Sequence, residues 1–305
     1  MALTFDQITS ITERKFLPKL VDNVFNSNVL LKKLKATEKL QSGGTQILQP
    51  LIYDEVSASG WYQGAETLDT TDNELFTAAA FDWAQAYANI SISRLDELKN
   101  SGDQAVLNFV KSKMMIAEKT LSKKLSTAVY NDGSSAKQIQ GLRLMLSTSN
   151  TYGGISQSDY SFWAANIDSS TTTLTLASLQ SVYGDCGEGT EYPNLMVCDQ
   201  DLWDLYKALL SPQQRFASSD SADGGFRSLL FNSTPVFVDA SAPSGHMIFL
   251  NMNYLDWMPH KDENMRIQPW ASPINQNVKS SKIFWAGGMA SSNNRRHGAL
   301  TAITA

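Results

Sequence analysis

The clearest periodic pattern in the chain lies between residues 101 and 130. Ser101 and Gln104 form a capping-box pair at its start, and Asn131-Asp132-Gly133 ends it. The pattern predicts a rigid helix of about thirty residues, about 45 Å long at 1.5 Å per residue. Its apolar stripe, at steps of three and four, comprises Val106, Val110, Met114, Ala117, Leu121, Leu125 and Ala128. Its other faces are rich in lysine: Lys111, Lys113, Lys119, Lys123 and Lys124.

Residues 45–93 have the pattern of two strands joined by a polar segment. Residues 45–53 are expected to form a strand that Pro50 restricts to an edge or a bulge. Residues 80–93 alternate at period two, with Ala84, Ala88 and Ile90 on one face. A lone hairpin is only marginally stable in water, and these strands have too few apolar residues for a core of their own. We therefore expect this arm to lie on another surface.

The charges of this arm have one sign. No Lys or Arg occurs between Lys39 and Arg94, whereas the same stretch holds seven acids. This asymmetry favours docking on a basic surface, either the lysines of the long helix or the basic N-terminal segment, although a solvated acidic loop has the same composition. Trp61 and Tyr62 are candidate aromatic anchors, unless they pack within the loop. The acidic candidates for contact between subunits are Asp54, Glu55, Glu66, Asp69, Asp72 and Glu74.

The remaining segments predict a mixed α+β fold. Residues 1–40 are expected to form a helical arm, and helices at 176–183 and 200–210 flank a buried strand at 195–198, which is typical of an α/β subdomain. The second helix would bury Leu202, Leu205 and Leu209. Further strands are predicted at 235–238, 247–250, 265–268 and 283–286, with a Ser/Gly-rich loop at 211–227.

Composition narrows the function classes. Charged residues make up only 18% of the chain, which favours extensive self-association because charges are depleted in interface cores. The net charge of −5 argues against nucleic-acid binding as the main task. Neither a secretion signal nor an apolar run of membrane-spanning length is present in the sequence. We therefore expect a protein that is made in the cytoplasm and does not span a membrane. Cys186 and Cys198 are expected to be buried, reduced thiols.

Catalytic and cofactor motifs are not found in the sequence. His246, His260 and His297 lack a second ligand at helical or strand spacing, and we expect them to be surface or hydrogen-bonded structural residues. The glycine clusters match neither a P-loop nor a dinucleotide-binding fingerprint, and no nucleophile elbow occurs. Arg295-Arg296-His297 is expected to be an exposed basic turn. We therefore predict no cofactor, no metal and no enzymatic activity.

The order of these parts resembles the tailed-phage major capsid protein family, which has the Hong Kong 97 fold. Four stretches carry the resemblance. Phe25-Asn26-Ser27-Asn28 is similar to the family's N-terminal arm, and Gly43-Gly44-Thr45 with Pro50 to the opening of its extended loop. Tyr152-Gly153-Gly154 followed by Phe162-Trp163 is similar to the start of its axial domain, and Thr234-Pro235-Val236 to its return path.

The resemblance implies an N-arm at 1–40, an extended β-hairpin loop at 41–97, a peripheral domain with the spine helix at 98–139 and 236–305, and an α/β axial domain at 140–235. It implies pentamers and hexamers that form an icosahedral phage head around double-stranded DNA, held without sequence-specific contact. Scaffold, portal and decoration proteins are the further partners, and the virion is the location.

Two departures from the family pattern limit the comparison. The best-known member crosslinks a lysine of its extended loop to a neighbour, and this loop has no lysine. The chain also starts almost directly at the N-arm, which implies either a separate scaffold or prior cleavage.

Alternatives to the phage capsid remain open. An encapsulin-like compartment would enclose protein instead of a genome, and nucleic-acid content would separate the two. A phage or bacterial surface-binding module would be a monomer or small oligomer. An unrecognised hydrolase would lose activity when one histidine is replaced.

Overall fold

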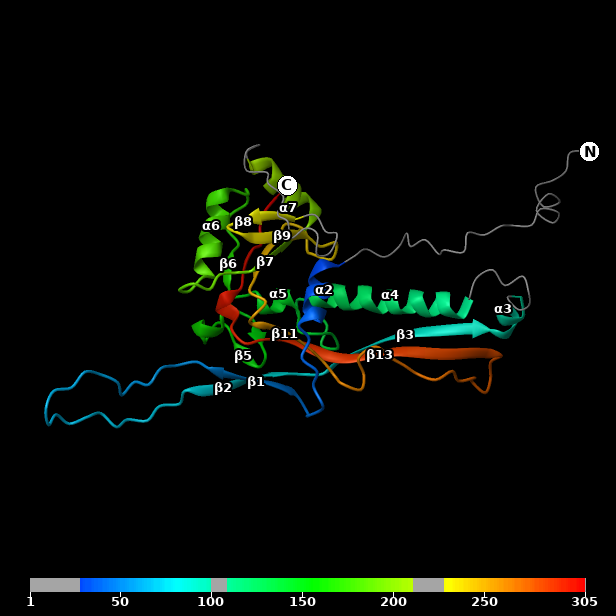
Figure 1. Ribbon diagram of the computed structural model, residues 1–305, viewed down its shortest axis with the longest axis horizontal. Coiled ribbons are helices and arrows are strands. Elements are labelled where there is room, and N and C mark those ends of the chain that lie inside the picture. The colour runs from blue at the N-terminus through cyan, green and yellow to red at the C-terminus, as the bar shows by residue number, and fades with distance from the viewer. Residues whose placement is uncertain (1–27, 100–108, 211–227, 305) are drawn as a thin grey trace, which may run out of the picture. The chain divides into compact units, whose positions relative to one another are not determined.

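The computed structural model describes residues 28–99, 109–210 and 228–304 (Figure 1). The fold is mixed α+β. The chain divides into two compact units. Of the described residues, the smaller comprises 87–99, 109–121 and 267–283, and the larger comprises 28–86, 122–210, 228–266 and 284–304. The predicted segment at 1–27, the capping pair Ser101/Gln104 and the predicted loop at 211–227 lie outside the described residues.

A six-stranded mixed sheet forms the core of the larger unit. The strands follow the order β6 (Asn166–Asp168), β14 (Gly298–Leu300), β10 (Met247–Leu250), β7 (Leu195–Cys198), β9 (Thr234–Val238) and β8 (Ser228–Phe231). The β6–β14 and β7–β9 pairs are parallel, and the others are antiparallel. Every residue of β7 and β10 is buried, which explains why both read as continuous apolar runs.

Helices α6 (Leu176–Asp185) and α7 (Gln200–Leu209) pack against this sheet (Figure 1). Thr175 caps α6 in a capping box with Ser178, and Asp199 caps α7 by accepting from the Leu202 N–H at 3.0 Å. The expected apolar stripe of α7 is partly wrong, since Leu209 is 40% exposed. The helix buries Leu202, Trp203 and Tyr206 because its aromatic residues, not its third leucine, face the sheet.

The hairpin arm belongs to the larger unit. Its stem pairs β1 (Ile47–Ile52) with β2 (Phe76–Phe81) in antiparallel register from Ile47↔Phe81 to Ile52↔Phe76. The single strand expected at 80–93 is wrong: Asp82 and Trp83 belong to no strand, and β3 (Ala84–Ser93) pairs with β13 (Val278–Ser291) in another sheet. The sequence does not reveal this interruption because the period-two alternation of side chains continues through Asp82 and Trp83.

One side of the stem lies on the body of its own chain. Ile47, Ala79 and Phe81 are buried, and the Phe81 and Tyr152 rings meet edge to face at 5.0 Å. The Ala80 N–H donates to the Gly153 carbonyl at 2.8 Å. Gly153 has φ +58°, and a Cβ there would lie 2.9 Å from Ala79 and Phe81. Close backbone approach therefore fixes the stem, so the arm lies on a surface of its own chain.

Further elements complete the larger unit. Helix α2 (Val29–Ala36) buries Leu30 and Leu34, and its Leu30 N–H donates to the buried Asp239 carboxylate at 3.2 Å. Strand β11 (Leu255–Pro259), which was not predicted, pairs with the last residues of β13 (Val278–Ser291), where the Trp257 and Trp285 rings stack at 5.1 Å. The short elements are α5 (Leu142–Met145), β4 (Thr151–Tyr152), β5 (Ile155–Ser156), η1 (Ser161–Trp163) and η4 (Asn294–Arg296).

The smaller unit combines sheet and helix. Strand β3 from Tyr87 onward pairs with the first residues of β13, which also pairs with β12 (Arg266–Ile267). Ala88, Ile90 and Ile92 are buried, which confirms the predicted alternation of this strand. After β3 comes α3 (Arg94–Lys99), and the first part of α4 (Phe109–Val129) completes the unit, with the Lys113 ammonium donating to the Ser91 carbonyl at 3.0 Å.

Helix α4 is the described part of the predicted long helix. Its 21 residues correspond to about 32 Å at 1.5 Å per residue. Ala117, Leu121 and Leu125 of the predicted stripe are buried, whereas Val110 is 38% exposed. Among the described helices, none has both the length and the apolar character needed to span a membrane.

Candidate functional site

The segment between β1 and β2 presents acidic and aromatic side chains to solvent. Residues 53–75 form no regular strand or helix. The Trp61 side chain is fully exposed and that of Tyr62 is 66% exposed. All six acidic candidates are exposed as well: Asp54, Glu55, Glu66, Asp69, Asp72 and Glu74. Trp61 and Tyr62 therefore do not pack into a core within this chain.

Local hydrogen bonds order this segment. The Tyr53 N–H donates to the Leu75 carbonyl at 3.2 Å, and the Asn73 amide donates to the Glu55 carbonyl at 2.9 Å. These contacts extend the pairing of the two halves of the hairpin beyond strands β1 and β2. At Asp69, the Thr71 hydroxyl and N–H both donate to the carboxylate, which lowers the pKa of this fully exposed group. Asp69 thus keeps its charge at neutral pH.

The lysine candidates all lie on α4. Lys111, Lys123 and Lys124 are exposed. Lys113 and Lys119 are half-buried. The structure thus gathers the acids on one segment and the lysines on one helix. The predicted contact between the two groups joins different copies of the chain, so it stays a prediction.

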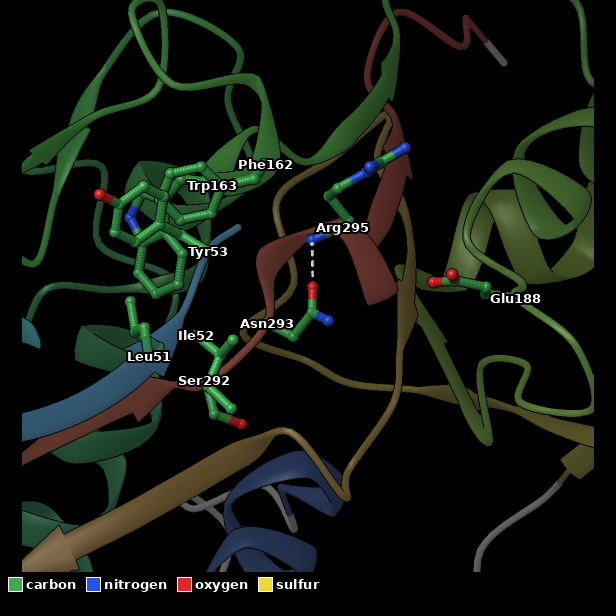
Figure 2. Close-up of a pocket in the computed structure, with 9 residues that line it drawn as sticks. All are labelled: Leu51, Ile52, Tyr53, Phe162, Trp163, Glu188, Ser292, Asn293 and Arg295. Atoms are coloured by element: carbon green, nitrogen blue, oxygen red, sulfur yellow. Dashed lines mark hydrogen bonds between the residues drawn. The ribbon is translucent and has the colours of Figure 1, made fainter. Parts of the chain in front are cut away.

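Sequence reasoning missed a hollow at the root of the arm, of about 170 Å³ (Figure 2). The aromatic side is formed by Tyr53 and Phe162, whose rings stack at 5.5 Å, together with Trp163. Figure 2 shows Asn293 and Arg295 on the opposite side, with the Arg295 N–H donating to the Asn293 side chain at 3.2 Å. The other lining residues are Leu51, Ile52, Glu188 and Ser292. Its small volume suits a single side chain better than a cofactor.

The expected exposed basic turn at 295–297 is partly wrong. Arg295 is exposed, but the Arg296 side chain is only 12% exposed and pairs with Glu188 at 2.5 Å. Beside this pair, the Tyr254 hydroxyl donates to the Glu191 carboxylate. The neighbouring Glu191 also raises the pKa of Tyr254. These contacts tie the turn at 188–191 to η4.

His297 is completely buried at the start of β14. Its Nδ1 accepts from the Asn251 N–H at 3.2 Å, so its Nε2 carries the proton of the neutral ring. Burial lowers the pKa of His297 to about 3. His246 and His260 make local hydrogen bonds with Ser244 and Asp262. All three histidines are therefore hydrogen-bonded structural residues, as predicted.

The two thiols are free and buried, as predicted. Burial raises the pKa of Cys186 to about 12 and also raises that of Cys198, so both remain protonated and unreactive. Within the described ranges, no three His, Cys, Asp or Glu side chains gather as metal ligands would.

No protein-family model and no curated protein sequence matches the chain. Solved structures do match it along its whole length. The capsid of cyanophage A-1(L) superimposes with a TM-score of 0.73 at 17% identity, covering 97% of this chain and 98% of that one. The chain has the fold of a tailed-phage capsid protein.

Two further structures with this capsid fold are similar over nearly full length. The capsid of a native GTA particle has a TM-score of 0.71 at 10% identity, covering 97% of this chain and 96% of that one. The SrpI encapsulin complex from Synechococcus elongatus PCC 7942 has a TM-score of 0.65 at 7% identity, covering 99% and 96%. At such identities the likeness establishes the capsid fold, and function needs its own argument.

Proposed function

We propose that this protein is the major capsid protein of a tailed phage, a structural subunit that assembles into a closed icosahedral shell around double-stranded DNA. The observation that carries the proposal is the end-to-end match with capsid subunits, 97% of this chain against 98% of the cyanophage protein. The protein acts through contacts between copies and not through catalysis, and its location is the virion. Scaffold, portal and decoration proteins are its further partners.

Under this proposal the chain has four parts. They are an N-arm (about 1–40), an extended loop (about 41–97), a peripheral domain (about 98–139 and 236–305) and an axial domain (about 140–235). The axial domain would also include β10 and β14, because both strands belong to the six-stranded sheet that contains β7 and β9.

The extended loop docks on a neighbouring subunit in this proposal. Its acids (Asp54, Glu55, Glu66, Asp69, Asp72 and Glu74) meet lysines of the neighbour's α4 or its basic N-arm, and Trp61 and Tyr62 anchor the contact. The support is their exposure, since an indole with full solvent access and an uncompensated acidic segment both favour a partner surface.

Assembly tests this function directly. Expressed full-length protein should form closed particles of uniform diameter in negative-stain images and sediment as large assemblies. Each interface would bury about 1,600 Å² or more, the size of a specific protein contact. A solution of monodisperse monomers or dimers across a range of salt and protein concentrations would refute the proposal.

The encapsulin compartment is the second candidate, because an encapsulin complex is among the structures that match. The phage head fits better, since the other matches described above are phage and GTA capsids. Particles purified from the cells or lysate where the protein is naturally made distinguish the two. Nuclease-protected double-stranded DNA inside the particles supports the phage head, and protein cargo without a genome supports the compartment.

A further inference from the structure

Helix α2 has no cap of its own at its N-terminus. The Asn28 side chain, at the N-cap position, accepts no hydrogen bond from the helix, and the first turn contains no acidic residue. Isolated helices shorter than about twelve residues are marginal in water, and α2 has eight residues. The helix therefore depends on the rest of the chain to satisfy its first N–H groups.

Asp239 supplies the cap from the position that follows β9. This residue is only 1% exposed. Its Oδ2 accepts from the Leu30 N–H at 3.2 Å, and its Oδ1 accepts from the Ser241 N–H at 2.8 Å. The N–H groups and the dipole of a helix both stabilise a carboxylate at its N-terminus. Because Asp239 lies 209 positions after Leu30 in the sequence, α2 is capped only while it is docked.

Asp239 depends on α2 in turn. Among the described residues, no lysine, arginine or histidine forms an ion pair with its carboxylate. Lys33 of α2 lies over the Phe237 ring instead, at 5.1 Å from the ring centroid. The other titratable groups around the carboxylate are the Tyr130 hydroxyl and the Cys198 thiol, and burial raises the pKa of both, so they stay protonated. A buried carboxylate without a cation is unfavourable, and the α2 N-terminus offsets part of that penalty.

Other contacts hold the remainder of this segment. Leu30 and Leu34 are completely buried. After the helix, the N–H groups of Lys39 and Gln41 donate to carbonyl groups of β11 at 2.8 and 3.0 Å. The apolar contacts make the docked helix the major state, and the contacts with β11 anchor residues 39–41 independently of Asp239.

We propose that α2 is a two-state element, helical when docked and unfolded when released, and that Asp239 sets the balance between the two states. Release removes the helix cap and exposes the carboxylate in one step, because each group is the partner of the other. In a shell, any contact that binds only one of the two states would shift this balance. The inference goes beyond the proposed function, since it concerns a single subunit and its tests need no particles.

Hydrogen exchange of unassembled, full-length subunits measures the balance. Asp239→Ala should raise the exchange rates of the amides of residues 32–36 together, by about tenfold, the effect of losing one helix cap. The amides of Lys39, Gln41 and β7 should change by less than about twofold, because their hydrogen bonds do not involve the cap.

The matched control is Asp168→Ala. Its carboxylate also accepts backbone N–H groups, from Ser170 and Thr171, but at the end of β6. This variant should leave the exchange of α2 unchanged. Unchanged exchange of α2 in Asp239→Ala, or an equal increase in α2 and β7, would overturn the inference.

The pH dependence of exchange is a second test, which a poorly folded alanine variant would not affect. Burial raises the pKa of Asp239 in the docked state, and release returns the carboxyl group to water. The docked state therefore binds a proton more readily, and this stabilisation is lost as the pH rises through the pKa of the docked state. After correction for the intrinsic amide rate, exchange of α2 should be about twofold slower at pH 5 than at pH 7.

Asp239→Asn separates charge from shape in this second test. The amide is uncharged at every pH and keeps one oxygen acceptor, so the pH dependence of α2 exchange should disappear in this variant. Faster exchange of wild-type α2 at pH 5 than at pH 7, or the same pH dependence in Asp239→Asn, would show that Asp239 does not control docking.

Discussion

The buried His297 makes subunit stability depend on pH below about 6.5. Its pKa is lowered by burial to about 3 in the folded chain, against about 6.5 for an exposed histidine. The unfolded chain therefore binds a proton below pH 6.5 that the folded chain does not bind until about pH 3. Stability from this residue is complete above pH 6.5 and falls as the pH falls through the window.

The magnitude follows from the two pKa values. Each pH unit inside the window lowers the free energy of unfolding by about 1.4 kcal/mol. Between pH 7 and pH 5 the loss from His297 alone is about 2 kcal/mol, because the window opens only below pH 6.5. This is a large share of the 5–15 kcal/mol that is typical of folded domains.

Urea unfolding of unassembled subunits at pH 7, 6 and 5 measures the effect. His297→Asn keeps an acceptor near the position of Nδ1 for the Asn251 N–H, and its stability should change about 2 kcal/mol less than that of wild type. His246→Asn removes a partly exposed histidine and is the matched control. Equal pH dependence of wild type and His297→Asn, within about 0.5 kcal/mol, would refute the reasoning. A ring proton of His297 that titrates near pH 6.5 in NMR spectra would refute it without any variant.

The remaining predictions concern charge, packing and thiols. The double variant Glu66→Lys with Asp69→Lys should abolish particle formation and leave subunits soluble. The control double variant, Asp159→Lys with Asp204→Lys, changes two other exposed acids and should still form particles. Equal particle yields from the two double variants would contradict docking of the acidic segment. Gly153→Ala should cost about 2 kcal/mol or more, because its Cβ would lie 2.9 Å from two side chains of β2. Gly154 has φ +78° and open space around its Cβ position, so Gly154→Ala should lose only the stability that the left-handed backbone conformation costs an alanine. A similar loss of stability in Gly153→Ala and Gly154→Ala would exclude the packing explanation. Cys186 and Cys198 should resist a disulfide reagent at pH 8 until the chain unfolds; rapid reaction of the native protein would contradict their burial.

Elements with one dominant pattern were predictable from sequence. The run at 195–198 is β7 as expected, because a strand buried on both faces must be apolar throughout. Helix α6 follows from its periodicity and its cap at Thr175. The break at Asp82 and Trp83 was not predictable, since side-chain alternation gives the face of each residue but not the strand that pairs with it.

The candidate site was predictable only in its charged part. The run of acids without Lys or Arg located the acidic segment, but the sequence left open whether Trp61 packs within the loop, and the structure shows this side chain exposed. The exposed apolar side of the β1–β2 stem, with Leu48, Ile52 and Phe76, was missed because both sides of the stem contain apolar residues and its polar residues, Gln49 and Thr77, lie on the buried side. Arg295 and Arg296 are adjacent in sequence, yet one is exposed and the other pairs with Glu188 in a turn more than 100 residues away.

The position of β14 in the six-stranded sheet has a consequence for synthesis of the protein. This strand lies between β6 and β10, so β6 joins the sheet only through residues 298–300. A nascent chain cannot complete this sheet on the ribosome until residue 300 has left the exit tunnel, and closure then requires pairing across more than 100 residues. Chains that end before residue 298 consequently lack the strand that joins β6 to the rest of the sheet.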